Sequence, residues 1–265
     1  MDAAEQVAEA DGFATHQSTA ALDALLARRA AGEPIQYVLG AWSFCGLDVF
    51  VDQRVLIPRP ETEVVAQHAI AEVARLGERV GRANPWTGSL THYAVADLGT
   101  GSGALALALA AALPDAEVWA TDASSDALAV ARANVAASGN LATRVRVAEG
   151  SWFAALPSEL RGRLLVVVSN PPYIAHDEPL PPSVLDWEPR GALFAGPTGF
   201  EAIAVLITEA LDWLDPAGTL VVELAPHQAD DAMVMARDVG YAEVVVRVDH
   251  SGRDRALVAR RRTDR

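Results

Sequence analysis

Helix-like and strand-like segments alternate along most of this 265-residue chain, and this order limits the possible fold more than any other feature. The strand-like runs of the alternating part include YAVAD, EVWATD, RVRVAE, LLVVVSN and GTLVVEL, and helix-forming segments such as GALALALAAAL lie among them. Strands that alternate with helices pack as a mostly parallel sheet with helices on both faces. The last two runs, YAEVVVRVD and RALVARR, flank a Ser-Gly turn and predict an antiparallel hairpin at the sheet edge. We therefore predict an α/β fold.

The first part of the chain predicts a different organisation. The segment STAALDALLARRAAGEP is typical of a helix that Ser18 or Thr19 can cap and that a glycine and a proline end. In the following WSFCGLDVFVDQRVLIPRPETE, aromatic and β-branched residues around a Cys-Gly pair predict a hairpin that leads into a loop. We divide the chain into a short N-terminal helical unit at 1–40, a hairpin and linker at 41–60, and an α/β domain at 61–265.

The composition argues against several classes of function. The formal net charge is −14, whereas stable DNA or RNA binding draws much of its affinity from basic side chains on phosphates. Cys45 is the only cysteine and the six histidines show no paired spacing, so we expect neither a disulfide nor a metal site. The apolar segment from Ala104 to Leu113 is about half of the roughly 20 residues that a membrane span needs. The acidic start lacks the regions of a secretory signal, so we expect a soluble cytoplasmic protein.

A glycine-rich loop, DLGTGSG, connects the first strand of the alternating part to the next helix. Its three glycines allow the backbone to turn sharply and approach a ligand, while the helix N-terminus offers free N–H groups. The loop residues that we predict to bind an adenosine cofactor are Gly99, Thr100, Gly101, Ser102 and Gly103. Asp122 ends the next strand, where a carboxylate can accept hydrogen bonds from ribose hydroxyls. The spacing resembles the loop of S-adenosylmethionine methyltransferases, but it also satisfies a looser dinucleotide pattern, so the loop alone leaves the cofactor open.

An Asn-Pro-Pro-Tyr sequence, Asn170 to Tyr173, follows an apolar strand near the point where open α/β sheets bind ligands. An amide nitrogen, or an amine on an aromatic ring, is a poor nucleophile because its lone pair is delocalised. The Asn170 side-chain oxygen and the Pro171 backbone carbonyl can accept its hydrogens and favour a lone pair aimed at a methyl donor. Pro171 and Pro172 fix φ and so hold these acceptors, and Tyr173 can lie against the flat target group. Catalysis would then come from positioning and preorganised acceptors, without a strong base.

Taken together, these motifs resemble the release-factor glutamine methyltransferase family. The resemblance covers nearly everything from Gly32 to the C-terminus and includes VLIPRPETE, DLGTGSGALALALA, SNPPYI, EPRGALFAGPTGFEAI and GRDRALVAR. The Asn-Pro-Pro-Tyr motif alone is shared with adenine methyltransferases of DNA, whereas LIPRPETE together with EPRGAL is much more specific.

The resemblance implies a Rossmann-like methyltransferase sheet in 61–265 and S-adenosylmethionine as cofactor. It implies methyl transfer to the side-chain amide of the Gly-Gly-Gln glutamine of a peptide-chain release factor, the expected protein partner. By the same resemblance Asn170 and Tyr173 match substrate-binding positions, Asn170 also borders the cofactor, and Trp152 lies beside its adenine.

Two features of this chain differ from the family pattern. The family commonly has an aspartate before that tryptophan, whereas this chain has Ser151, and the helical part that helps to hold the protein substrate is short here. We expect Arg59, Glu61 and Glu63 to brace their loop, because ion pairs and caps are common near a helix start.

Three other functions remain open on the sequence. An amino-methyltransferase of adenine in nucleic acid would use the same Asn-Pro-Pro-Tyr chemistry on a flipped base, against a charge of −14. A nicotinamide-dependent oxidoreductase would explain the glycine loop and Asp122 but leave Asn170 and Tyr173 without a role. A non-enzymatic cofactor-binding scaffold is the third, and a related enzyme acting on another protein glutamine is a variant of the leading hypothesis.

Overall fold

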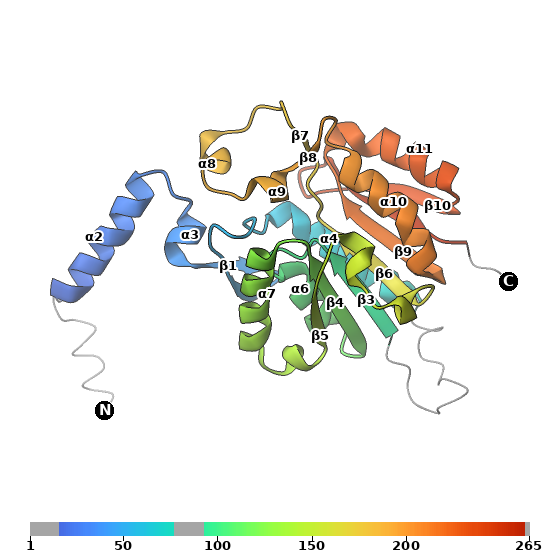
Figure 1. Ribbon diagram of the computed structural model, residues 1–265, viewed down its shortest axis with the longest axis horizontal. Helices are drawn as coiled ribbons and strands as arrows, with labels where there is room; N and C mark the ends of the chain where they lie inside the picture. The colour runs from blue at the N-terminus through green and yellow to red at the C-terminus, as the bar shows by residue number, and fades with distance from the viewer. Residues whose placement is uncertain (1–15, 77–92, 263–265) are drawn as a thin grey trace.

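A seven-stranded sheet forms the centre of the computed structural model, which describes residues 16–76 and 93–262 (Figure 1). Its strands are β3 (Tyr93–Leu98), β4 (Ala116–Asp122), β5 (Val145–Glu149), β6 (Leu164–Ser169), β9 (Leu214–Glu223), β10 (Glu243–Val248) and β11 (Asp254–Arg260). Their order across the sheet is β10-β11-β9-β6-β3-β4-β5. The five strands from β9 to β5 are parallel, whereas β11 is antiparallel to both β9 and β10. The predicted α/β fold with a C-terminal antiparallel hairpin at the edge is therefore confirmed.

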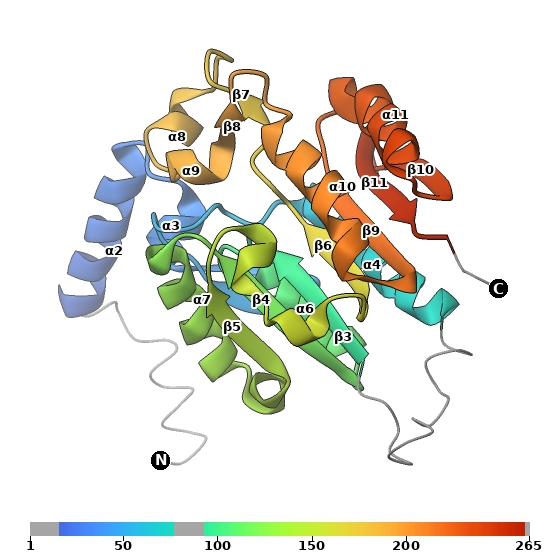
Figure 2. The ribbon, with the colours of Figure 1, turned by 45° about the vertical axis from the view of Figure 1, so that its right-hand side comes forward.

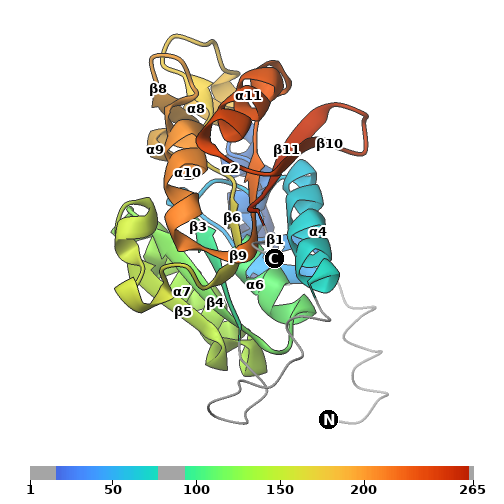
Figure 3. The ribbon, with the colours of Figure 1, turned by 90° about the vertical axis from the view of Figure 1, so that its right-hand side faces the viewer.

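Helices cover both faces of this sheet, and α4 and α10 lie on opposite sides of it in Figure 3. The helices around the sheet are α4 (Pro60–Arg75), α6 (Ala104–Ala112), α7 (Ser125–Ala137), α10 (Glu201–Trp213) and α11 (Ala229–Val239). One core cluster joins α4, α6 and α7 to strand residues such as Val95 and Val166, and the other joins α10 and α11 to their neighbours Ala96 and Val167. Alternate strand residues thus enter opposite cores, as a sheet buried on both faces requires.

The N-terminal helical unit lies on the opposite side of the molecule from the C-terminal hairpin (Figures 1 and 2). It contains α2 (His16–Ala30) and α3 (Ile35–Leu39). Because α2 already begins at His16, Ser18 and Thr19 lie inside the helix, and the prediction that one of them caps it was wrong. Its apolar residues pack little, since the Leu22 and Leu26 side chains are 55% and 57% exposed.

The predicted hairpin is present as β1 (Ala41–Phe44) and β2 (Leu47–Phe50), which pair in antiparallel register. Cys45 and Gly46 form its two-residue turn with φ of 49° and 75°, the left-handed values that suit the right-handed twist of a hairpin. The Asn134 side chain of α7 accepts a hydrogen bond from the Phe50 N–H and donates one to the Phe50 carbonyl. These bonds fix the hairpin against α7.

Four further short elements lie together beside the start of α10 (Figure 2). They are β7 (Ile174–Ala175), β8 (Phe194–Gly196), α8 (Pro182–Leu185) and α9 (Arg190–Leu193). β7, which directly follows the Asn-Pro-Pro-Tyr sequence, pairs with β8 as a small parallel sheet. Across the described ranges, the helices are all too short or too polar to cross a lipid bilayer.

Candidate active site

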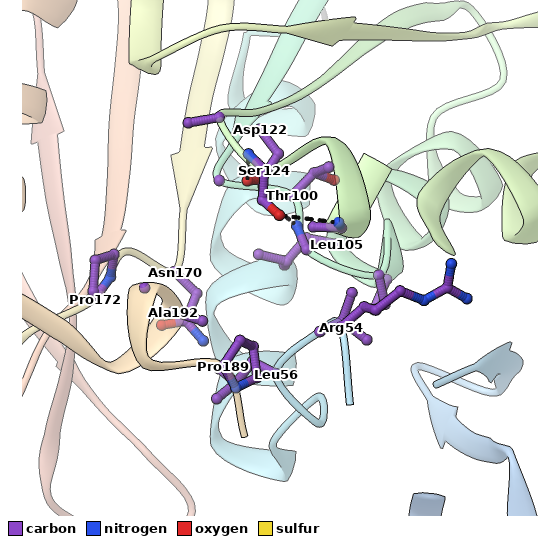
Figure 4. Close-up of a pocket in the computed structure, with 18 of the residues that line it drawn as sticks. Arg54, Leu56, Thr100, Leu105, Asp122, Ser124, Asn170, Pro172, Pro189 and Ala192 are labelled. Carbon is purple, nitrogen blue, oxygen red and sulfur yellow. Dashed lines mark hydrogen bonds between the residues drawn. The ribbon is translucent and has the colours of Figure 1, made fainter. Parts of the chain in front are cut away.

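A cavity of about 470 Å³ lies at the carboxyl ends of β3, β4 and β6. β3 lies between β4 and β6, and the strand order changes direction there: β4 and β5 lie on one side of β3, whereas β6 and β9 lie on the other. The cavity therefore occupies the topological switch point of the sheet. The predicted residues that line it are Gly99, Thr100, Gly101, Ser102, Asp122, Trp152, Asn170 and Pro172. The predicted residues outside its lining are Gly103, Pro171 and Tyr173. Figure 4 shows Asp122 and Asn170 approaching the cavity from different strands.

The glycine loop has the conformation that its sequence indicates. Gly99, Gly101 and Gly103 have backbone φ angles of 74°, 56° and 83°, which residues with a Cβ atom rarely adopt. Gly103 caps α6, and a Cβ there would stand 3.5 Å from Ala131 of α7, so its absence also permits close helix packing. The backbone N–H groups of Gly99 and Thr100 both donate to the Thr121 carbonyl at 2.8 Å, which ties the loop to β4.

Asp97 supports this loop from below, a role that our sequence analysis did not assign. Its buried carboxylate accepts hydrogen bonds from the Thr100 hydroxyl at 2.6 Å and the Ala106 N–H at 3.0 Å through Oδ2. Burial raises the pKa of Asp97 to about 7, although both hydrogen bonds act in the other direction. The signal available in the sequence was an acidic residue at the end of an apolar strand that begins a glycine loop.

Asp122 faces the cavity at the end of β4. Its Oδ2 accepts from the Gly101 N–H at 2.9 Å, and its Oδ1 accepts from the Ser124 N–H at 2.9 Å. Each carboxylate oxygen retains a further acceptor position, so the group can still accept two ligand hydroxyls. This is the chemistry that the ribose of an adenosine cofactor requires.

Trp152 covers the glycine loop from the side of β5. It lies in a 3₁₀ turn (Trp152–Ala155) with φ of 46°, and a Cβ on Gly99 would be 3.5 Å from its ring. Together with the small residue Ala127, which also lines the cavity, the ring offers an apolar surface that suits a flat adenine. Ser151 lines the cavity beside Trp152. Its neutral hydroxyl accepts a weaker hydrogen bond from a ligand than a carboxylate at this position would.

Asn170 borders the cavity directly after β6. Its side-chain Nδ2 donates a hydrogen bond of 3.1 Å to the Thr62 hydroxyl of α4. Within the described part of the chain no hydrogen bond reaches the other end of the amide, Oδ1, which leaves this oxygen available as an acceptor for a ligand.

Tyr173 packs into the core on the α10 side of the sheet rather than along the cavity wall. Its hydroxyl donates to Glu223 Oε1 at 3.3 Å, and its backbone carbonyl accepts from the Gln228 side chain at 3.0 Å. Burial raises the pKa of Tyr173, so the hydroxyl keeps its proton. In this structure the tyrosine therefore anchors the loop, and its contact with a flat target group stays a prediction.

Two loops on the outer side of the cavity are held together by an ion pair. Arg59 and Glu188 form this pair, and Glu188 Oε2 also accepts from the Ile57 N–H at 3.3 Å. Because the Glu188 side chain is 1% exposed, the pair fixes the loop before α4 to the loop before α9. Glu63 accepts from the Cys45 N–H at 2.8 Å, and Glu61 pairs with Arg253 at 3.4 Å, so all three predicted bracing residues hold neighbouring segments.

Comparison with known proteins places these features in context. Residues 87–180 match the family described as Methyltransferase small domain, and residues 1–40 match the PrmC N-terminal domain. The release factor glutamine methyltransferase of Geobacter sulfurreducens is 38% identical over 92% of this chain and 79% of its own length. Proteins of the same name from Burkholderia pseudomallei and Moorella thermoacetica are 42% and 43% identical, over 88% and 89% of this chain and 78% of each relative.

Solved structures support the fold alone, because their sequences are much less similar. The N-terminal domain of human METTL16 in complex with SAH is 17% identical and has a TM-score of 0.60, covering 87% of this chain and 82% of that one. A methyltransferase from Pyrococcus furiosus is 18% identical with a TM-score of 0.53, covering 82% of this chain and 90% of that one.

Proposed function

Because this chain belongs to the release factor glutamine methyltransferase family, we propose that it transfers a methyl group from S-adenosylmethionine to a release-factor glutamine. The acceptor is the side-chain amide nitrogen of the glutamine in the Gly-Gly-Gln sequence of a peptide-chain release factor. The observation that carries this proposal is one cavity that contains both the glycine loop and the free acceptor of Asn170. The relatives favour this reaction over adenine methylation, hydride transfer and a role as a scaffold.

The described residues fit the cofactor on the side of β3 and β4. The left-handed glycines keep three positions of the loop free of side chains, and Asp122 keeps two acceptor positions for the ribose. Trp152 offers a flat surface for the adenine. When bound, S-adenosylmethionine supplies an electrophilic methyl group on its sulfonium sulfur.

The residues after β6 hold the acceptor amide. Asn170 Oδ1 and the Pro171 carbonyl accept its two N–H bonds, which directs the nitrogen lone pair toward the methyl group. Pro172 and Pro171 fix the backbone of these acceptors through their rings. The amide nitrogen held by these acceptors would take the methyl group while the sulfur leaves as a neutral thioether, and the nitrogen, then strongly acidic, would release one proton to water. Orientation and preorganised acceptors therefore supply most of the rate enhancement.

The domain boundaries follow from this assignment. We infer that 61–265 is the methyltransferase domain, that 41–60 joins it to the N-terminal part, and that 1–40 contacts the protein substrate. The exposed leucines of α2 and α3, which include Leu22 and Leu26, support the last of these inferences.

Methyl transfer to a purified release factor tests the proposal directly. Labelled methyl from S-adenosylmethionine should appear on the factor, and should be absent from a copy with the Gly-Gly-Gln glutamine replaced by alanine and from DNA and RNA. Asn170→Ala should lower the rate at saturating cofactor by about 100-fold and leave cofactor affinity largely intact, since its acceptor acts on the reacting nitrogen. Asn140→Ala, an exposed asparagine away from the cavity, is the matched control and should keep the parent rate. Label on nucleic acid, or an Asn170→Ala rate equal to that of the parent, would contradict the proposal.

A further inference from the structure

A buried carboxyl group, Glu223, lies behind the acceptor side of the cavity. It ends β9, which runs parallel to β6 in a register that pairs Val222 with Ser169, so Glu223 stands level with Asn170. The residue is 1% exposed, and its Oε1 accepts from the Tyr173 hydroxyl at 3.3 Å. Its Oε2 is also buried, and no described residue meets it with hydrogen-bond geometry. A half-satisfied buried carboxyl group is costly, so its presence calls for a reason.

Thr62 connects this carboxyl group to the acceptor amide. Its hydroxyl accepts the Asn170 Nδ2 hydrogen bond at 3.1 Å, and the same hydroxyl neighbours Glu223 and lowers the pKa of that carboxyl group. A threonine hydroxyl has one proton to donate. Since Asn170 uses the hydroxyl as an acceptor, the hydroxyl proton is available to Glu223, whose Oε2 has no hydrogen-bond partner among the described residues.

This arrangement decides which end of the Asn170 amide faces the cavity. The oxygen and nitrogen ends of an asparagine amide have nearly the same shape, so packing alone does not distinguish them. A Thr62 hydroxyl without a second acceptor could equally donate to Asn170 Oδ1. The Asn170 NH₂ group would then face the substrate amide, and a donor would meet a donor.

We propose that Glu223 is a positioning residue that draws the Thr62 proton and thereby keeps Asn170 Oδ1 directed at the substrate nitrogen. The inference rests on the proposed function for the identity of that nitrogen. Its geometric part does not depend on substrate: Asn170 donates to the Thr62 hydroxyl, and Thr62 neighbours the buried Glu223 carboxyl group.

The charge state of Glu223 controls the direction of this chain. Burial raises the pKa of Glu223 to about 7, Thr62, Arg255 and Tyr173 lower it, and Glu61 raises it. These groups face the carboxyl group from α4, β11 and the loop after β6. Above this pKa the carboxylate accepts from Thr62. Below it, the protonated group can donate, which reverses the chain and turns the Asn170 amide, so methyl transfer should fall as the pH falls through about 7.

Single-turnover methyl transfer at saturating cofactor tests the chain with Glu223→Gln, Thr62→Val and their double variant. Each single change should lower the rate by about 10-fold or more, the size expected for a misdirected hydrogen bond. The double variant should be no slower than the slower single variant, because both changes break one chain. Thr62→Ser keeps the hydroxyl and should retain most of the rate. The parent rate should rise through pH 7, and the Glu223→Gln rate should not.

Thr219→Val is the matched control. Thr219 lies on the same strand, is buried, and donates its hydroxyl to the carboxylate of Glu72 at 3.1 Å, outside the cavity. This variant should keep the parent's pH profile. Effects of Glu223→Gln and Thr62→Val that multiply, or a Glu223→Gln profile equal to the parent's, would overturn the proposal.

Nuclear magnetic resonance of the Asn170 side-chain NH₂ gives a readout that needs no substrate. Its ¹⁵N signal, assigned by its loss in Asn170→Asp, should shift with a midpoint near pH 7 in the parent and stay constant in Glu223→Gln. If this titration is present while release factor stays unlabelled, the positioning role stands and the proposed function fails. If release factor is labelled while the signal does not titrate, the positioning role fails and the proposed function stands.

Discussion

Replacing Glu223 by glutamine should stabilise the folded protein above pH 7, even as it slows the reaction. Glutamine has nearly the same shape and can still accept from Tyr173, but it never carries the charge that burial makes unfavourable. The parent must ionise this group inside the core at alkaline pH, and the variant does not. Glu223→Gln therefore separates the effect of the buried charge on stability from its effect on the reaction rate.

The magnitude follows from the difference between the folded and unfolded states. The pKa of Glu223 rises from an ordinary value of 4.5 to about 7 in the folded protein, mainly through burial. A group whose pKa is raised by folding binds its proton more tightly in the folded state. Its contribution to stability is complete below pH 4.5 and is lost as the pH rises to about 7. At about 1.4 kcal/mol per pH unit, the parent loses about 3 kcal/mol across this range relative to a variant that cannot titrate.

Urea denaturation of parent and Glu223→Gln protein at pH 5, 6, 7 and 8 measures this term. The difference in the free energy of unfolding should move in favour of the variant by about 1 kcal/mol for each pH unit up to about 7 and then level off. All other titrating groups are shared by the two proteins, so their contributions cancel. A difference that stays constant from pH 5 to pH 8 would refute the assignment of Glu223 as a group that ionises near neutrality.

Two further changes test the cofactor side and the loop after β6. Asp122→Ala should weaken S-adenosylmethionine binding about 10-fold to 100-fold, measured by titration calorimetry, because it removes a charged acceptor; unchanged affinity would contradict the ribose assignment. Gly199→Ala would place a Cβ 2.7 Å from the Tyr173 carbonyl oxygen at a φ of 78°, whereas Gly252→Ala has a φ of 82° and no atom within 4 Å. Gly199→Ala should therefore lower the free energy of unfolding by about 1 to 3 kcal/mol more than Gly252→Ala, and equal losses would contradict this reading.

Local patterns predicted most of the sheet and the part of the cavity lined by the glycine loop and Asp122. Strand and helix periodicity depends on nearby residues, and the switch point follows from topology alone. The glycine loop and Asp122 are likewise local features, since each lies at the carboxyl end of a predicted strand. One local prediction was wrong: α2 begins at His16, before the residues chosen as its cap, because a polar residue in a helix resembles a cap until the true start is known.

The support behind Asn170 could not be predicted, because it joins residues that are far apart in the sequence. Glu223 is the next-to-last residue of the apolar run GTLVVEL, and nothing in that run distinguishes a carboxylate that points into the core from one in solvent. Thr62 lies between two glutamates in a segment typical of an exposed helix start, yet it is 4% exposed. Tyr173 was expected at the cavity, but its partner Glu223 is visible only once β6 and β9 are neighbours.

The prolines beside Asn170 explain why such support is needed. They fix backbone φ angles, but the last side-chain torsion of an asparagine is broad and roughly two-fold, so its amide can turn over within a rigid backbone. Thr62 can hold one end of the amide, but its own hydroxyl also rotates and fixes no direction by itself. The Glu223 carboxylate can only accept hydrogen bonds, so the Thr62 hydroxyl donates its proton to Glu223 and accepts from Asn170. Burying Glu223 thus lowers stability, and in return the reacting nitrogen meets the Asn170 oxygen in a fixed orientation.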